Sequence, residues 1–170
     1  MVSYEEALAI VLATAPELSA EIIHFQESLG RVLAADIMSD IDLPPFSKSA
    51  MDGYACRRED LAKELDIVEV IPAGKKPSVS IGDGQCAKIM TGAMIPAGAD
   101  VVIKIEDTES DQEGRVRFTA EKTKSNIIFK AEDVDKGDVV LNRGVIIKPQ
   151  HIAVLATVGC INPEVMRKVR

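Results

Sequence analysis

Glycine and proline divide the middle of this chain into short segments, and this pattern limits the possible folds more than any other feature of the sequence. The runs rich in β-branched residues between them are short, and the clearest are 66–71, 101–105 and 116–119. Such runs, bounded by turn-forming residues, are typical of strands. Aromatic residues make up only 4% of the chain and Trp is absent, so we expect a core of Val, Ile, Leu and Ala.

The helix signals lie at the two ends of the chain. A helix is predicted over 3–13, because Ser3 can cap it and Glu6 follows at the spacing of a capping box. A final helix is predicted over 149–158, where a proline suits the first turn and a glycine follows the last. A helical turn or short helix is expected over 28–35.

Together these signals predict a mainly β fold with flanking helices, in the α+β class. We expect a β-rich module at residues 44–135, inserted into a mixed α/β module made of residues 1–43 and 136–170.

Charge and cysteine content limit the possible partners and compartments. The chain has 20 Lys and Arg against 27 Asp and Glu, a net charge of −7, whereas nucleic-acid and anionic-membrane binders need a basic surface. No apolar run approaches the roughly 20 residues that span a bilayer. Cys56, Cys86 and Cys160 are widely spaced, match neither a zinc site nor a disulfide framework, and are interpreted as small buried hydrophobic residues. Without a basic secretory leader, we expect a cytoplasmic protein that binds neither nucleic acid nor membrane.

Residues 42–57 are predicted to form a shaped loop that holds one acid, Asp52, in a defined place. Pro44 and Pro45 stiffen its approach, since proline fixes φ and lacks a main-chain donor. Asp52 can be a ligand for Mg²⁺, which prefers oxygen ligands. It can equally be the first residue of an Asp-Gly turn with Gly53, and spacing alone favours this second interpretation.

A second loop of glycine and proline occupies residues 90–96. Thr91 could offer a hydroxyl there, and the neighbouring N–H groups could cradle an anion. The loop lacks the residue order of a P-loop, and a simple turn at the end of a strand is the alternative.

Other charged groups carry weaker signals. The acidic cluster at 132–138 lacks the spacing of a calcium loop and is interpreted as a solvated turn. The lysines at 75–76 are interpreted as part of an exposed loop. His24 and His151 have no ligand spacing and are interpreted as structural.

The combination of segments is more specific than any one of them. It runs, in order, through residues 30–34, 43–46, 49–55, 89–93, 96–100, 106–107, 132–133, 136–138 and 155–159. This set resembles the N-terminal region of the MoeA family of molybdopterin molybdenumtransferases, which is related to the E domain of gephyrin. The resemblance covers essentially the whole chain.

The resemblance implies a four-domain enzyme of which this chain matches the first two domains. The end of the chain, 165–170, matches the strand that introduces the pterin-binding third domain, so that domain and the fourth are expected to be absent and this chain to be inactive alone. The reaction implied joins molybdate, as substrate, to adenylylated molybdopterin with release of AMP and with Mg²⁺ as cofactor. The two domains are implied to build an elongated homodimer, in which the β-rich module reaches the partner's pterin domain. A molybdopterin adenylyltransferase is a further partner suggested by this pathway.

The resemblance also implies roles for individual residues. Asp52 and Thr91 match catalytic positions, and Asp52 is the expected metal ligand. Ser49, Gly92 and Asp133 match substrate-binding positions. The chain departs from the family at 128–131, where an Arg-rich stretch and a Gly are usual.

Lys130 keeps one positive charge in that segment but cannot reproduce the paired contacts of an arginine, which puts anion binding there in doubt. Two alternatives to the transferase stay open from the sequence. One is a non-catalytic dimerisation or interaction module of cofactor assembly, and the other is a small-oxyanion binder that uses Thr91.

Overall fold

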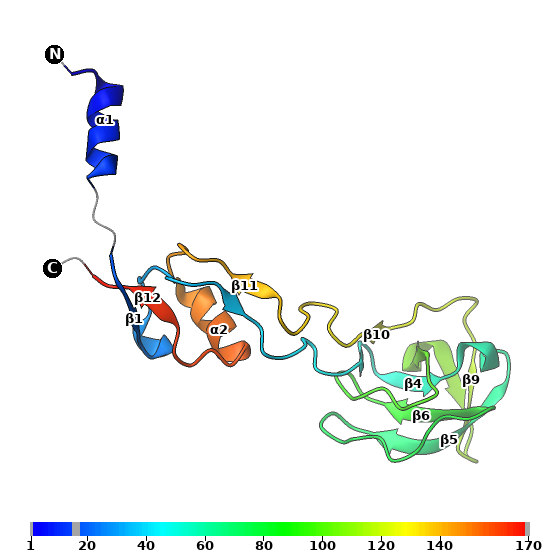
Figure 1. Ribbon diagram of the computed structural model, residues 1–170. Helices are drawn as coiled ribbons and strands as arrows, with labels where there is room; N and C mark the ends of the chain where they lie inside the picture. Colours follow the sequence, from blue (N-terminus) through cyan, green and yellow to red (C-terminus); the bar gives the residue numbers. More distant parts are fainter. Residues whose placement is uncertain (1, 15–17, 169–170) are drawn as a thin grey trace. The chain divides into compact units, whose positions relative to one another are not determined.

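The computed structural model describes residues 2–14 and 18–168. The chain divides into two compact units, one made of residues 1–40 and 137–170 and the other of residues 41–136 (Figure 1). The junctions predicted from the sequence, after residues 43 and 135, lie within three residues of these boundaries. Each unit is described separately below.

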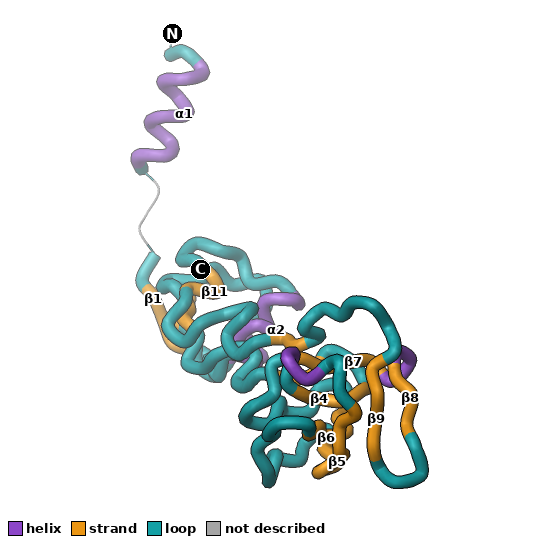
Figure 2. The backbone as a smooth tube through the Cα atoms, turned by 90° about the vertical axis from the view of Figure 1, so that its right-hand side faces the viewer, coloured by secondary structure: helices purple, strands orange, loops and turns teal. Residues whose placement is uncertain are grey.

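The unit at 41–136 is built on a six-stranded sheet with the strand order β7-β4-β6-β5-β9-β8. Figure 2 shows these strands lying side by side. Its strands are β4 (Gly53–Cys56), β5 (Glu64–Ile71), β6 (Gln85–Ile89), β7 (Val101–Lys104), β8 (Thr108–Ser110) and β9 (Arg115–Phe118). Only the pairing of β5 with β6 is parallel among these strands. A smaller pair joins β3 (Lys48–Ser49) to β10 (Ile127–Ile128), and short 3-10 turns cover Arg58–Asp60 and Ile105–Asp107.

Apolar side chains cover both faces of this sheet. One face carries Ala55, Ile71, Ile81, Ala87, Ile89, Ala93, Val102 and Ile127. The other carries Tyr54, Cys56, Leu65, Cys86, Val101, Ile103 and Val116. The aliphatic core expected from the composition is confirmed, as is the mainly β fold with flanking helices.

The prediction that residues 42–57 form a loop throughout was wrong at its end. Residues 53–56 form β4, a strand between β6 and β7 whose four residues are all buried. A strand covered on both faces shows no alternation of apolar and polar residues, so its pattern is hard to separate from that of a loop of small residues. The acid therefore sits at the start of a central strand.

The unit at 1–40 and 137–170 contains the two α-helices found among the described residues, α1 (Tyr4–Ala13) and α2 (Pro149–Thr157). It also contains the strand pair β1 (Ala20–Ile22) with β12 (Glu164–Met166) and the pair β2 (Ile37–Met38) with β11 (Val139–Leu141). Its buried apolar residues include Leu33, Ile147, Leu155, Val158 and Val165. Neither helix is long and apolar enough to cross a membrane.

The helix predictions at the chain ends are confirmed. Ser3 and Glu6 form both bonds of the capping box, at 3.2 Å and 2.9 Å. The short helix expected over 28–35 was wrong. A 3-10 turn at Phe25–Glu27 ends before it, and Val32 and Leu33 form isolated β-bridges instead, with the N–H of Leu33 donating to Val145 O at 3.0 Å. The strand predicted over 165–170 is confirmed only at its start, because β12 ends at Met166, residues 167–168 are not strand, and residues 169–170 lie outside the described range.

Candidate functional site

Asp52 and Thr91, which the sequence singled out in two separate loops, are hydrogen-bonded to each other. The main-chain N–H and the hydroxyl of Thr91 both donate to Asp52 Oδ1, at 2.7 Å and 2.9 Å. The sheet explains why they meet. Gly53 at the start of β4 lies opposite Ile89 at the end of the antiparallel β6, so the residues just outside these strand ends come together.

Gly53 lets Asp52 occupy this position. A Cβ atom added to Gly53 would lie 1.9 Å from the main-chain oxygen of Ile103 in β7, so no side chain fits there. The N–H of Ile105, just after β7, donates to Asp52 O at 3.2 Å. The main chain at Asp52 is thus anchored to the end of β7, while Thr91 after β6 holds its carboxylate.

The electrostatics favour the ionised form of Asp52. Hydrogen bonds from the N–H and then the hydroxyl of Thr91 lower the pKa of Asp52 below its ordinary value, because they stabilise the charged form. Both bonds are made to Oδ1, while the side chain is exposed. A charged carboxylate with one oxygen open to solvent suits a hard cation.

The chain offers few further ligands for such a cation. No group of three His, Cys, Asp or Glu side chains close enough to hold a metal occurs in residues 2–14 and 18–168. Magnesium is commonly bound through one or two carboxylates together with substrate phosphates and water. A metal-ligand role for Asp52 stays a prediction.

Ser49 and Gly92 belong to the frame of the same site. The N–H of Gly92 donates to Ser49 O at 2.8 Å, and the N–H of Ser49 donates to Ala93 O at 2.9 Å. The Ser49 hydroxyl donates to Met51 O at 2.6 Å, and the side chain is only 1% exposed. These contacts hold the two loops together, and substrate contact by Ser49 and Gly92 stays a prediction.

The idea that the N–H groups of the second loop cradle an anion finds no support in the geometry. Those of Thr91, Gly92, Ala93 and Ile95 each donate to an acceptor within the protein. An anion that used these four N–H groups would have to displace the bonds they already make, and anion binding at Thr91 stays a prediction.

Asp133 is bonded to a different part of the chain from this pair. Its N–H donates to Leu43 O at 2.9 Å, at the base of the proline loop, and its side chain is exposed. No hydrogen bond or ion pair joins it to Asp52 or Thr91 within the described chain. Its role in substrate binding stays a prediction.

The segment that departs from the family pattern has an unusual backbone and a neutralised charge. Ala131 has φ +61°, a left-handed conformation that suits the Gly usual in the family. Lys130 Nζ lies 2.9 Å from Asp42 Oδ2, so its positive charge is already paired. This pairing lowers the pKa of Asp42. Nothing in the sequence links these two residues, because they are far apart in the chain and share no spacing pattern.

The other polar residues noted from the sequence make local contacts. Lys75 Nζ lies 3.0 Å from Glu69 Oε1, so it is not a free positive charge. His24 Nδ1 accepts from the N–H of Gln26, and His151 Nδ1 accepts from the N–H of Lys148. Cys56 and Cys86 are buried and Cys160 is partly buried, and all three are free thiols.

Comparisons with known proteins point to one family. Residues 2–159 match the family model described as "MoeA N-terminal region (domain I and II)". A protein named molybdopterin molybdenumtransferase from Staphylococcus epidermidis is 37% identical over 177 residues, which cover 98% of this chain and 42% of that protein. The protein of the same name from Staphylococcus aureus is 36% identical over 172 residues, which cover 96% of this chain and 41% of that protein.

Solved structures give the same picture. A crystal structure of the molybdopterin biosynthesis moeA protein from Pyrococcus horikoshii OT3 matches with a TM-score of 0.90 and 37% identity, covering 99% of this chain and 46% of that one. A second structure of the Pyrococcus protein matches with a TM-score of 0.84 and 34% identity, covering 99% and 45%. The chain spans less than half the length of these relatives.

Proposed function

The chain belongs to the MoeA N-terminal region family, and we propose that it is the N-terminal part of a molybdopterin molybdenumtransferase, which inserts molybdate into adenylylated molybdopterin with release of AMP. The relatives of that name and the matching architecture support this proposal. The observation that supports the proposal most directly is the hydrogen-bonded pair Asp52–Thr91, because it joins two of the loops on which the family resemblance rests. The chain spans 42% of the relative from Staphylococcus epidermidis, so the proposal assigns the pterin site to the remainder and expects no turnover from this chain alone.

The proposed role of Asp52 is to supply a fixed negative charge at the reacting end of the substrate. Thr91 keeps the carboxylate ionised and oriented through its two bonds to Oδ1, and the second oxygen remains available. In this proposal Asp52 is the protein ligand for Mg²⁺, which when bound neutralises charge on the phosphates and the oxyanion. Gly53 and Ser49 hold the two loops so that the carboxylate needs little reorganisation.

The test is molybdenum insertion into adenylylated molybdopterin, measured after the remaining domains are supplied. Asp52→Asn keeps an acceptor for Thr91 but removes the charge, and we expect a loss of at least about a hundredfold in rate, in the range seen for lost electrostatic groups. Asp66→Asn is the matched control, because Asp66 is an exposed aspartate of β5 outside the site. Equal activity of the two variants would remove Asp52 from the mechanism.

A homodimer is also part of the proposal, and helix α1 supports it. None of its ten residues is buried, even though several are large and apolar. The side chains of Tyr4, Ile10, Val11 and Leu12 are all more than half exposed. A helix that presents apolar side chains on most of its surface gains stability by packing against a partner. A second copy of this chain is the partner that the family resemblance implies.

Light scattering with size-exclusion chromatography tests the dimer. Val11→Glu combined with Leu12→Glu should convert it to a monomer, whereas Glu5→Gln in the same helix should not. A dimer that lacks any insertion activity once the other domains are present would favour the alternative, a non-catalytic dimerisation or interaction module.

The proposed cytoplasmic location is supported by three free thiols, which fit a reducing compartment.

A further inference from the structure

A second candidate site lies at the opposite end of β4 from Asp52. Asp52 precedes the first residue of this strand, and Arg58 follows shortly after its last residue, Cys56. Next to Arg58 is an open pocket of about 640 Å³, here called the basic pocket. It is lined by Arg58, Leu61, Ala62, Arg117, Phe118, Ala120, Glu121, Lys122 and Thr123.

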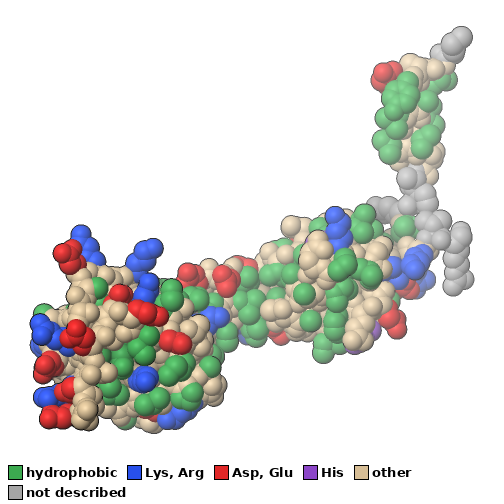
Figure 3. Space-filling view, turned by 180° about the vertical axis from the view of Figure 1, so that it is seen from behind, with side chains coloured by type: hydrophobic (Ala, Val, Ile, Leu, Met, Phe, Trp, Pro, Cys, Tyr) green, Lys and Arg blue, Asp and Glu red, His purple; other side chains and the backbone are tan. Residues whose placement is uncertain are grey.

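The charge of the basic pocket differs from that of the chain as a whole. Arg58, Arg117 and Lys122 line it against a single acid, Glu121, although the chain carries a net charge of −7. On the face shown in Figure 3, basic and acidic side chains lie interspersed. The basic pocket differs from that pattern, because its lining has three basic residues and one acid. Within the described residues, neither Arg117 nor Lys122 forms an ion pair.

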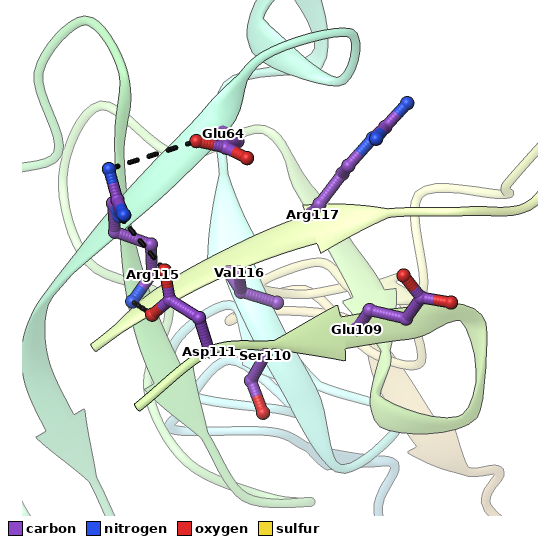
Figure 4. Close-up of a pocket in the computed structure, with 7 residues that line it drawn as sticks. All are labelled: Glu64, Glu109, Ser110, Asp111, Arg115, Val116 and Arg117. Atoms are coloured by element: carbon purple, nitrogen blue, oxygen red, sulfur yellow. Dashed lines mark hydrogen bonds and ion pairs between the residues drawn. The ribbon is translucent and has the colours of Figure 1, made fainter. Parts of the chain in front are cut away.

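Arg117 lies directly opposite Glu64 on β5 and Glu109 on β8 in the sheet, yet it forms no ion pair with either in the described chain. Arg115 lies 3.0 Å from Asp111 and 3.8 Å from Glu64, and it also bonds Glu113. Figure 4 shows the Arg117 side chain extending away from this ion-paired cluster. Arg117 can therefore offer its guanidinium to an anion in the basic pocket, where it can make two parallel bonds to a carboxylate.

Arg58, which also lines this pocket, is held in place by the protein. Its main-chain N–H donates to Asp100 Oδ1 at 2.7 Å, and one side-chain nitrogen donates to Thr123 O at 3.3 Å. A guanidinium carries five N–H donors, so most of them stay available for a ligand.

The basic pocket also offers apolar surface and free main-chain donors. Leu61 and Phe118 are partly exposed and pack against the core cluster on that face of the sheet. Of the main-chain N–H groups at 120–124, all in the described chain, none donates a hydrogen bond within the protein. The apolar floor separates the two kinds of ligand, because a free phosphate gains nothing from Leu61 and Phe118, whereas an extended peptide can cover them with an apolar side chain.

We propose that the basic pocket binds an extended acidic segment of another protein. Carboxylates of that segment pair with Arg58 and Arg117, an apolar side chain covers Leu61 and Phe118, and its main chain meets the free donors at 120–124. This function is separate from the proposed transferase chemistry, because it uses no residue of the Asp52 site.

Fluorescence anisotropy with the 170-residue chain tests this, using the fluorescein-labelled peptide Glu-Asp-Leu-Glu-Leu-Asp as the probe. Arg58→Gln combined with Arg117→Gln should weaken binding at least about tenfold, since the charge-assisted bonds of both guanidinium groups are lost. Lys76→Gln combined with Arg143→Gln is the control, because it removes the same charge away from the pocket. A probe with Ser in place of both Leu should also bind more weakly, and that comparison leaves the protein unchanged.

Three results would overturn the proposal. The first is no saturable binding, or equal weakening by the two double variants, which would mean nonspecific attraction. The second is displacement of the probe by inorganic phosphate or AMP at matched concentration, which would mean a simple anion site. The third is self-association of the chain that the pocket variants abolish, which would make a second copy the occupant.

Discussion

Gly53→Ala is the substitution for which the structure predicts the largest effect from the smallest change. The added Cβ would lie 1.9 Å from Ile103 O, whereas the closest favourable carbon–oxygen contacts are about 3.3 Å. Strands β4 and β7 would have to separate by roughly 1.4 Å, about a third of the usual 4.8 Å spacing between strands. The hydrogen bonds between them could not survive that shift.

We expect a destabilisation of about 3 kcal/mol, at the upper end of the range for overpacked cores. For the unit at 41–136, which falls in the size range of a small domain, that lowers the melting temperature by roughly 12–24 °C. Thermal unfolding followed by circular dichroism measures it, and hydrogen exchange at the Ile105 N–H reports whether the contact with Asp52 O is lost.

Gly84→Ala is the control for Gly53→Ala. Gly84 has φ +65°, and no atom lies within 4 Å of the position that an added methyl group would take. An alanine there therefore meets only the cost of left-handed backbone, about 1–2 kcal/mol. If Gly53→Ala cost less than Gly84→Ala, close approach of β7 would not be the reason for glycine next to Asp52.

Three further predictions concern other parts of the chain. Ala131→Gly should stabilise by about 0.5–1 kcal/mol in urea unfolding, since Ala131 sits at φ +61°, and a neutral or destabilising result would contradict strain there. Burial raises the pKa of all three thiols, to about 12 for Cys56 and Cys86, and only Cys160 is partly exposed, so a thiol reagent at pH 8 should modify Cys160 first in the native protein and all three cysteines after unfolding. Hydrogen bonds from the Ser78 hydroxyl and N–H, with Lys75, lower the pKa of Glu69 from 4.5 to about 2, so its contribution to stability is present above pH 4.5 and is lost as pH falls toward 2. Glu69→Gln should flatten the stability curve over that window, and an unchanged curve would show that another group titrates there.

Sequence reasoning succeeded where local chemistry decides the structure. The capping box at Ser3 and the turn residues around the strands act within a few positions, so their spacing is visible in the chain. It failed at residues 28–35 and at β4, where distant partners decide. Leu33 is held by Val145, and β4 is buried between two strands from later in the chain. Local propensity contains no information about those contacts.

The same division applies to the candidate site. Asp52 and Thr91 could be picked out as loop residues, but spacing alone favoured a simple turn for each, and only the antiparallel register of β4 and β6 brings them into contact. The positive charge of Lys130 could be read from the sequence, whereas its pairing with Asp42 could not.

The contact between Asp52 and Thr91 argues for a prepared ligand over an ordinary turn. In an Asp-Gly turn the carboxylate bonds the main chain just after itself. Here its bonds come instead from Thr91 on another strand end, and both are made to one oxygen. A cross-strand bond of this kind fixes the side chain without closing a local turn, keeps it ionised and leaves it exposed. The proposed role as a metal ligand therefore depends on the bonds from Thr91, which the sheet register creates, and not on a local turn.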